Sequence, residues 1–170
     1  MGKELVAVKK IFAEFKSEFD NELSVTRRLI HRNVVKFIGW CIGEFEFSLV
    51  YEYMPNGCLE SHLHGNETTL PWHIRYSVAT DLVSAIHYLH EGAEKCVIHR
   101  DIKPENILLD KYFTAKLGDF GIAKLMSLRT SETSTGPGTP GYQAPEYLEQ
   151  PNANKEADMN LVQFIREKYL

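Results

Sequence analysis

The fold of this chain is decided by residues 97–121, VIHRDIKPENILLDKYFTAKLGDFG. Two of the acids in this stretch, Asp101 and Asp119, have Lys103 and Asn106 between them. Carboxylate and amide oxygens are ligands that Mg²⁺ accepts, and a lysine ammonium is a point charge that binds phosphate. These are the residue types that transfer of a phosphoryl group requires. The plainer alternative is a loop whose Asp and Asn side chains only cap turns.

The order of the residues favours a site for phosphoryl transfer over a loop of turn-capping side chains. His99-Arg100-Asp101 followed by Asn106 matches H-R-D-x-x-x-x-N, and residues 119–121 match D-F-G. With both motifs in this order, the sequence resembles a eukaryotic protein kinase. The resemblance implies that Asp101 orients the substrate hydroxyl and accepts its proton, that Lys103 lies beside the γ-phosphate, and that Asn106 and Asp119 ligate Mg²⁺. A lysine at position 103 resembles serine/threonine kinases rather than tyrosine kinases.

Composition limits the other functions that need consideration. The 170 residues suggest one domain, and 44% apolar with 25% charged residues argues against disorder. A net charge of −4 gives no electrostatic footprint for nucleic acid. The three cysteines are widely spaced without a C-x-x-C pair, so reduced thiols of a cytosolic protein are expected. No run approaches the roughly 18 apolar residues of a membrane span, and no membrane segment is expected.

Two N-terminal segments predict an ion pair. Residues 4–12 have the alternation and β-branching of a strand, within which Val6-Ala7-Val8-Lys9 resembles the kinase strand whose lysine holds the α- and β-phosphates. Residues 13–30 are expected to form a helix, and Glu22 shares its apolar face. A buried carboxylate needs a partner, and Lys9 is the expected one, although a solvated glutamate at the rim stays possible. The apolar stripe comprises Phe12, Phe15, Phe19, Leu23 and Ile30.

The next strand-like runs, 34–41 and 47–53, lead into LVYEYMPNG at 49–57, which resembles plant receptor-like kinases. A plainly packed sheet would fit these residues equally well. By the resemblance, Tyr51 is the gatekeeper, and Glu52 and Met54 offer backbone C=O and N–H to adenine. The resemblance also assigns two apolar side chains to the nucleotide site, Ala7 and Leu108.

Helices are expected over residues 58–64 and 72–91, the longer one buried on one side and stopped by Gly92. The segments at 89–91 (LHE) and 95–101 (KCVIHRD) look most like the lectin-type subgroup of plant receptor-like kinases.

Residues 121–141 correspond to the activation segment of a kinase. Arg100 is expected to bind a phosphorylated hydroxyl there through charge-assisted hydrogen bonds. The resemblance also has Thr139 bonded to Asp101 or Lys103, within a peptide-binding segment that ends in the A-P-E motif at Glu146. The candidate phosphorylation sites are Ser127, Thr130, Ser131, Thr133, Ser134, Thr135 and Thr139.

Some positions depart from the family pattern. The glycine-rich loop and its two strands are expected before Val6, where the sequence has the single Gly2. After Glu146 the family has a buried helix, whereas 151–170 forms a divergent amphipathic tail. Thr26 stands where an aliphatic residue of the hydrophobic spine is usual. A kinase domain truncated at both ends is therefore expected.

The sequence thus predicts an α+β fold: a two-lobed protein-kinase fold that is incomplete, with a partial antiparallel N-lobe sheet, an αC-type helix and a mainly helical partial C-lobe. Its expected divisions are 4–54 (partial N-lobe and hinge), 55–150 (partial C-lobe) and 151–170 (tail). The implied function is ATP- and Mg²⁺-dependent phosphorylation of protein Ser/Thr hydroxyls, in the cytoplasm. A membrane-anchored parent receptor is implied by resemblance only. A catalytically silent scaffold and a gene fragment that does not fold remain the alternatives.

Overall fold

The computed structural model describes residues 5–65, 67–126, 138–139 and 141–143. Several sequence-based expectations concern residues outside this part of the chain. They are the hydroxyls from Ser127 to Thr135, the expected role of Glu146, and the helical tail at 151–170. Thr139 lies within the described residues.

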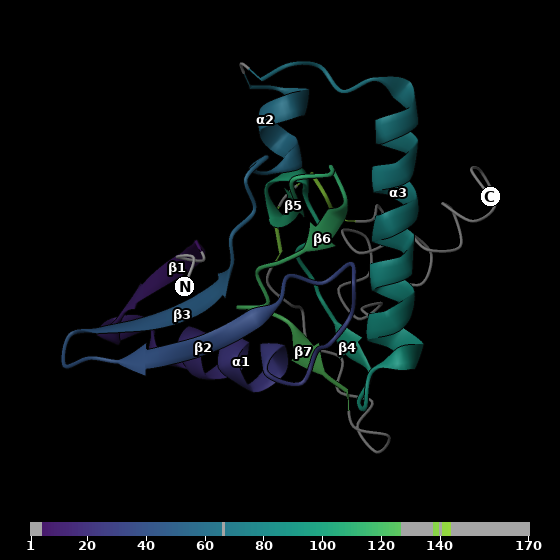
Figure 1. Cartoon of the computed structure of the whole chain (residues 1–170). Coiled ribbons are helices and arrows are strands. Elements are labelled where there is room, and N and C mark those ends of the chain that lie inside the picture. Colours follow the sequence, from purple (N-terminus) through teal and green to yellow (C-terminus); the bar gives the residue numbers. More distant parts are fainter. Residues whose placement is uncertain (1–4, 66, 127–137, 140, 144–170) are drawn as a thin grey trace, which may run out of the picture.

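The N-terminal part is a three-stranded antiparallel sheet backed by one helix (Figure 1). Strands β1 (Val6–Phe12), β3 (Glu46–Glu52) and β2 (Phe37–Ile42) follow in the spatial order β1-β3-β2. Helix α1 (Lys16–Thr26) follows the 3₁₀ turn η1 (Ala13–Phe15) and packs on the sheet, where Phe19 stacks on Phe47 with ring centroids 4.8 Å apart. This part matches the predicted partial N-lobe and αC-type helix.

The apolar stripe predicted for residues 13–30 is only partly correct. Phe19 is buried, but Phe12, Phe15 and Ile30 are exposed. Phe12 belongs to β1 and Phe15 to η1, so neither side chain follows the helical register of α1. The helix also ends at Thr26, which places Ile30 in the connecting segment and not on the helix face.

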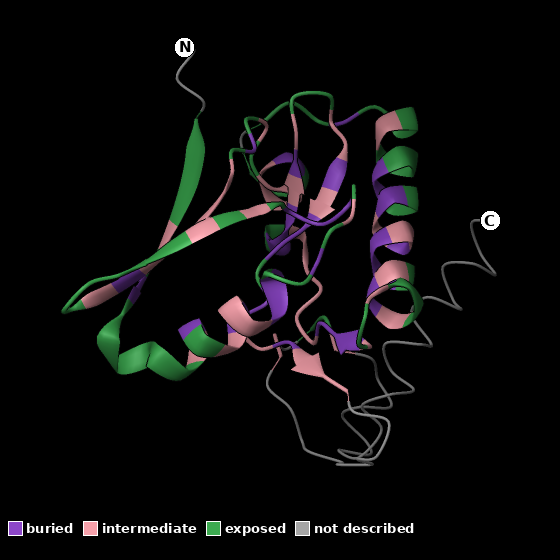
Figure 2. Ribbon diagram, turned by 60° about the horizontal axis from the view of Figure 1, so that its bottom comes forward, coloured by how far each residue is buried: buried purple, intermediate pink, exposed green. Residues whose placement is uncertain are grey.

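The remainder is built from helices and short strand pairs. Helix α2 (Leu59–Leu63) and helix α3 (Trp72–His87) match the predicted helices, except that α3 ends earlier and passes into the π-helical turn η2 (Tyr88–Gly92). Strand β5 (Ile107–Leu109) pairs with β6 (Ala115–Leu117), β4 (Val97–Ile98) pairs with β7 (Lys124–Leu125), and the 3₁₀ turn η3 (Pro104–Asn106) precedes β5. Figure 2 shows the buried side of α3 turned toward these strands.

A shared core joins the sheet-and-helix part to the helical part. Val25 of α1 belongs to the same buried cluster as Ala85 of α3, Leu117 of β6 and Phe120. Asn33 is completely buried and donates from Nδ2 to the Ala115 carbonyl at 3.0 Å, while its own carbonyl accepts the Leu117 N–H at 2.9 Å. These contacts fix the segment that precedes Asp119 against the segment that leads into β2. The predicted α+β architecture, with a partial antiparallel sheet and a separate part that carries α2 and α3, is confirmed within the described residues.

Candidate functional site

A cavity of about 400 Å³ lies between the sheet and the β5–β6 region. Its wall contains most of the side chains that the sequence assigned to a nucleotide site: Ala7, Lys9, Glu22, Tyr51, Glu52, Met54, Asn106, Leu108 and Asp119. Asp101 and Lys103 do not line the cavity. Asn106, which does, donates hydrogen bonds to Asp101, and Asp101 is paired with Lys103. The fold therefore gathers residues from the whole length of the described chain at one place.

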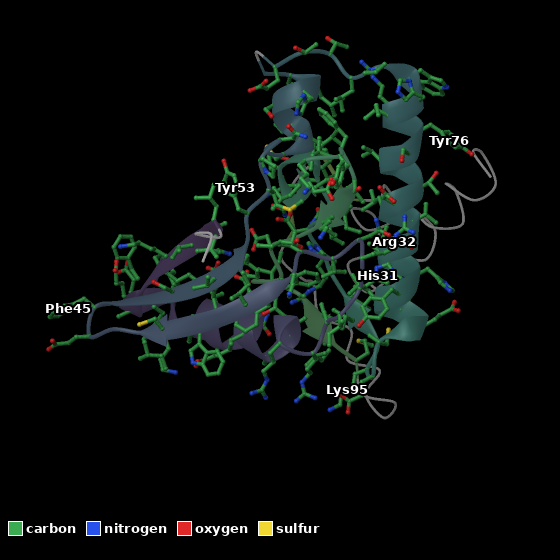
Figure 3. All side chains as sticks on the ribbon, in the orientation of Figure 1. His31, Arg32, Phe45, Tyr53, Tyr76 and Lys95 are labelled. Atoms are coloured by element: carbon green, nitrogen blue, oxygen red, sulfur yellow. The ribbon has the colours of Figure 1, made fainter. Side chains whose placement is uncertain are left out.

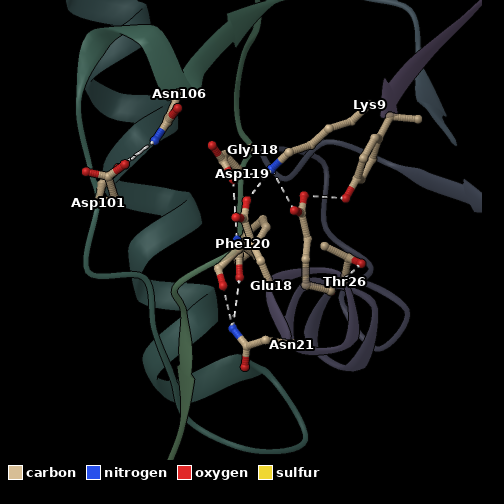
Figure 4. A network of polar contacts seen from close by, with 12 residues as sticks. Lys9, Glu18, Asn21, Thr26, Asp101, Asn106, Gly118, Asp119 and Phe120 are labelled. Atoms are coloured by element: carbon tan, nitrogen blue, oxygen red, sulfur yellow. Dashed lines mark hydrogen bonds and ion pairs between the residues drawn. The ribbon is translucent and has the colours of Figure 1, made fainter. Parts of the chain in front are cut away.

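Lys9 forms the centre of a charged network at the inner end of this cavity (Figure 4). Its Nζ lies 2.7 Å from Glu22 Oε2 and 2.9 Å from Asp119 Oδ1. The predicted Lys9–Glu22 pair is confirmed, and Glu22 is buried as expected. A third carboxylate, which was not predicted from the sequence, is that of Glu18, whose Oε1 lies 3.5 Å from the same nitrogen.

Burial and pairing set the charge state of this network. Burial alone would lower the pKa of Lys9, but the carboxylates of Glu22 and Asp119 outweigh that effect and hold the pKa above its ordinary value. Burial raises the pKa of Glu22, against the opposing effects of Lys9 and of the Tyr51 hydrogen bond. Lys9 is therefore a permanent cation at the inner end of the cavity.

Tyr51 binds the carboxylate oxygen of Glu22 that Lys9 does not contact, and the sequence did not predict this hydrogen bond. The Tyr51 hydroxyl donates to Glu22 Oε1 at 2.7 Å, so each oxygen of this buried carboxylate has its own donor. Burial and the neighbouring carboxylate raise the pKa of Tyr51, which keeps the hydroxyl protonated as a donor. Thr26 is buried beside them and donates to the Glu22 carbonyl at 2.8 Å.

A second cluster surrounds Asp101. Its carboxylate accepts hydrogen bonds from the Thr139 hydroxyl at 2.5 Å, Lys103 Nζ at 2.9 Å and Asn106 Nδ2 at 3.1 Å. Lys103 Nζ also donates to Thr139 Oγ1 at 2.9 Å, so the expectation for Thr139 is confirmed. Burial would raise the pKa of Asp101, but these three donors hold it below its ordinary value. The hydrogen bond to Asp101 raises the pKa of Lys103.

The backbone has an uncommon conformation at Asp119 and at Arg100, the residue before Asp101. Arg100 and Asp119 have φ values of 69° and 60°, a region that non-glycine residues adopt only at some energetic cost. His99 holds the two segments together: it is buried, its Nε2 bonds the Gly118 carbonyl at 2.9 Å, and its Nδ1 accepts the Asp101 N–H at 3.3 Å. Nδ1 is thus the acceptor and Nε2 carries the proton. Burial lowers the pKa of His99, so the ring is neutral.

Two further residues hold the segment after Asp119. Asn21 of α1 donates from Nδ2 to the carbonyls of Gly121 at 2.8 Å and Ala123 at 3.0 Å. Arg100 donates from Nε to the Ile122 carbonyl at 2.7 Å. Helical periodicity gave no signal for Asn21. The expected contact between Arg100 and a phosphorylated hydroxyl stays a prediction.

Comparison with known proteins decides the family. The protein kinase domain profile matches residues 2–161. The chain belongs to the protein kinase family. It is 48% identical over 159 residues to the L-type lectin-domain containing receptor kinase IX.1 of Arabidopsis thaliana, and 49% identical over 160 residues to receptor kinase IX.2 of the same plant. Each alignment covers 91% of this kinase chain and 24% of the relative.

These relatives are receptor kinases by name, as is the probable receptor kinase S.5 of Arabidopsis thaliana, which is 42% identical over 163 residues. The chain spans about a quarter of the length of these curated relatives. The predicted likeness to plant lectin-type receptor-like kinases is confirmed.

Proposed function

We propose that this kinase chain transfers the γ-phosphoryl group of ATP to Ser or Thr hydroxyls of a protein substrate. One observation carries the proposal: Lys9, Asn106 and Asp119 line one cavity, Lys9 is paired with Asp119, and Asn106 holds Asp101 next to it by a hydrogen bond. We retain the divisions 4–54 and 55–150 as the two lobes on either side of this cavity.

The walls suit a nucleotide. Ala7 of β1 and Leu108 of β5 offer apolar surfaces for an adenine ring, while the backbone of Glu52 and Met54 offers polar groups at its edge. Gly118 keeps the cavity open, since a Cβ there would approach Val35 to 3.2 Å and Leu108 to 3.6 Å. Lys9, fixed by Glu22, is placed to bind phosphate oxygens as a point charge.

The donor set also suits Mg²⁺, which would offset the negative charge of the phosphate groups. Asp119 has a half-exposed carboxylate, and Lys9 contacts one of its two oxygens. Asn106 uses its Nδ2 for Asp101, which leaves the amide oxygen as an acceptor. Carboxylate and amide oxygens are the ligands that a hard cation takes. We assign the metal site to these two residues.

Asp101 is suited to orient a hydroxyl group. With its pKa held below the ordinary value it stays ionised, so it accepts a hydrogen bond well but is a weak base. Lys103 and Asn106 fix its carboxylate, and Thr139 already places one hydroxyl against it. In this proposal Asp101 aligns the substrate hydroxyl and takes its proton late, when the bond to phosphorus is forming.

We further propose that the parent protein is a membrane receptor with this kinase unit on its cytosolic side. The names of the similar plant proteins support the proposal. Within the described part of the chain, no helix has the length and apolarity to cross a membrane.

The first test is a thermal melt of the full chain with and without Mg-ATP. A ligand that binds only the folded state at about 100 times its Kd stabilises by about 2.7 kcal/mol, and Asp119→Ala should lose most of that gain. Asp20→Ala is the matched control, because Asp20 is an exposed acid of α1 paired only with Lys16 within the described residues. A phosphate-transfer assay with a generic protein substrate follows.

The outcomes separate the alternatives. A shift that depends on Asp119, together with transfer, supports the proposed kinase. A shift without transfer favours a nucleotide-binding scaffold, and a cooperative melt without any shift contradicts the nucleotide site.

A further inference from the structure

A second cavity, of about 570 Å³, lies on a different part of the molecule. We name it the basic pocket. It is enclosed by the end of α1, the segment 27–36, the start of β2 and one residue of β6, and none of its lining residues lines the nucleotide cavity. Figure 3 shows His31 and Arg32 of this segment beside α3. The cations of its wall are Arg27, Arg32, Lys36 and Lys116.

The wall carries more positive charge than its neighbours neutralise. Lys116 is well buried and paired with both oxygens of Glu52, at 2.7 and 2.8 Å. Arg32 Nη2 lies 3.4 Å from Asp81 Oδ1. Within the described residues, no ion pair involves Arg27 or Lys36, and the lining itself contains no carboxylate. About two positive charges are therefore left over.

His31 adds no charge to this total at neutral pH. Its ring stacks on Tyr88 with centroids 4.6 Å apart, and the Tyr88 hydroxyl accepts the Ile30 N–H at 3.0 Å. Burial, followed by the positive charge of Arg32, lowers the pKa of His31. The histidine thus shapes the wall without contributing to the binding of an anion.

The inner surface of the basic pocket is apolar. Leu29 and Val34 are buried there, and Phe37 contributes an aromatic ring that also packs against Trp40 and Tyr51. Ile30, another lining residue, is exposed. A ligand that fits must therefore combine two negative charges with an apolar body. A bare anion would leave the apolar surface unused, and a neutral apolar molecule would leave the cations unpaired.

We propose that the basic pocket binds an organic phosphate, with its dianionic head between Arg27 and Lys36 and its apolar body on Leu29, Val34 and Phe37. A phosphate monoester carries close to two negative charges at neutral pH and offers three acceptor oxygens. The site is separate from the proposed site for ATP, so the two can be tested independently of each other.

The test is a calorimetric titration of the full chain with phenyl phosphate at low salt. The double variant Arg27→Gln/Lys36→Gln should bind about tenfold more weakly or worse, equal to about 1.4 kcal/mol. Arg28→Gln is the matched control. Arg28 is the neighbour of Arg27 but faces Glu94 at 3.6 Å and the Ser24 carbonyl at 3.2 Å, and it does not line the pocket. This control should change the affinity by less than about twofold.

Three further binding measurements can overturn the proposal. Inorganic phosphate must bind more weakly than phenyl phosphate, since equal binding would mean that the apolar surface contributes nothing. Lys9→Met must retain phenyl phosphate binding, because its loss would place the ligand in the nucleotide cavity. Equal weakening by Arg28→Gln would show that general surface charge is responsible. The Arg27→Gln/Lys36→Gln and Arg28→Gln variants should melt near the wild-type temperature, because these three side chains are exposed. Lys9→Met loses the partner of the buried Glu22, so its binding is measured at a temperature at which its melt shows it folded.

Discussion

Two charged clusters flank the proposed reaction site, and they are built in opposite ways. The Lys9 cluster (Lys9, Glu22, Tyr51, Asp119) joins residues as far as 110 positions apart, and its Glu22 side chain is only 1% exposed. The Asp101 cluster (Asp101, Lys103, Asn106, Thr139) is mostly local, with Asn106 five positions from Asp101. One cluster depends on the packing of the sheet and α1, the other on one loop.

The difference between the clusters also appears in the pKa values of their acids, Glu22 and Asp101. Burial raises the pKa of Glu22 despite its two donors, whereas three donors hold the pKa of Asp101 below its ordinary value despite partial burial. The Lys9 cluster therefore works as a structural junction that fixes a cation. In the proposed reaction, the Asp101 cluster keeps an ionised oxygen in place to accept a hydrogen bond from the substrate hydroxyl. Removing one member should affect nucleotide binding in the first case and the chemical step in the second.

The largest expected effect is that of Asp101→Asn on catalysis. The variant removes the ionised acceptor that aligns the substrate hydroxyl, so kcat should fall by about 10²- to 10⁴-fold. Nucleotide affinity should hardly change, because Asp101 does not line the nucleotide cavity. Steady-state rates and the Mg-ATP thermal shift measure the two quantities. A variant that loses both equally would contradict the separation of roles.

Tyr51→Phe tests the Lys9 cluster. The change leaves one oxygen of a buried carboxylate without its donor, which should cost about 1–3 kcal/mol of unfolding free energy. Tyr53→Phe is the matched control: its side chain is half exposed and no hydrogen bond to its hydroxyl is found within the described residues, so a change within about 0.5 kcal/mol is expected. Urea unfolding measures both. Equal losses would mean that Tyr51 does not hold Glu22.

The two clusters also differ in how far the sequence predicts them. Three members of the Asp101 cluster, Asp101, Lys103 and Asn106, could be predicted together because they stand at fixed short spacings within one motif. Thr139 lies 38 positions from Asp101, and only the resemblance to kinases predicted its contact. The pairing of Lys9 with Glu22 could be predicted as well, since a buried acid on an apolar helix face needs a cation. The α+β fold followed from the same motifs.

Contacts that depend on the meeting of separate elements could not be predicted. Tyr51 reaches Glu22 only because β3 packs against α1. Asn21 reaches the carbonyls after Asp119 only because the middle of α1 passes that segment. The exposure of Ile30 was missed because helical spacing continues in the sequence beyond Thr26, where the helix itself ends. Periodicity predicts a face, but the end of a helix depends on tertiary contacts.

The smallest expected effect concerns the pH dependence of folding stability, to which Glu22 and Asp101 should contribute with opposite signs. A carboxyl with a raised folded-state pKa holds its proton more tightly when folded, so the stability it contributes is lost as pH rises above its ordinary value. For Glu22 that ordinary value is 4.5. A carboxyl with a lowered folded-state pKa behaves in the opposite way, and for Asp101 the contribution disappears as pH falls below 3.8.

Glu22→Gln and Asp101→Asn separate these two contributions, since each replaces the acid by a neutral group of similar shape. The stability of the wild type relative to Glu22→Gln should decrease as pH rises from about 4 to about 7, while relative to Asp101→Asn it should increase up to about pH 4 and then level off. Urea midpoints of the three proteins across this range give both curves. If the two curves have the same slope, the pKa values of Glu22 and Asp101 shift in the same direction on folding, and the contrast between a buried junction and a donor-held acid fails.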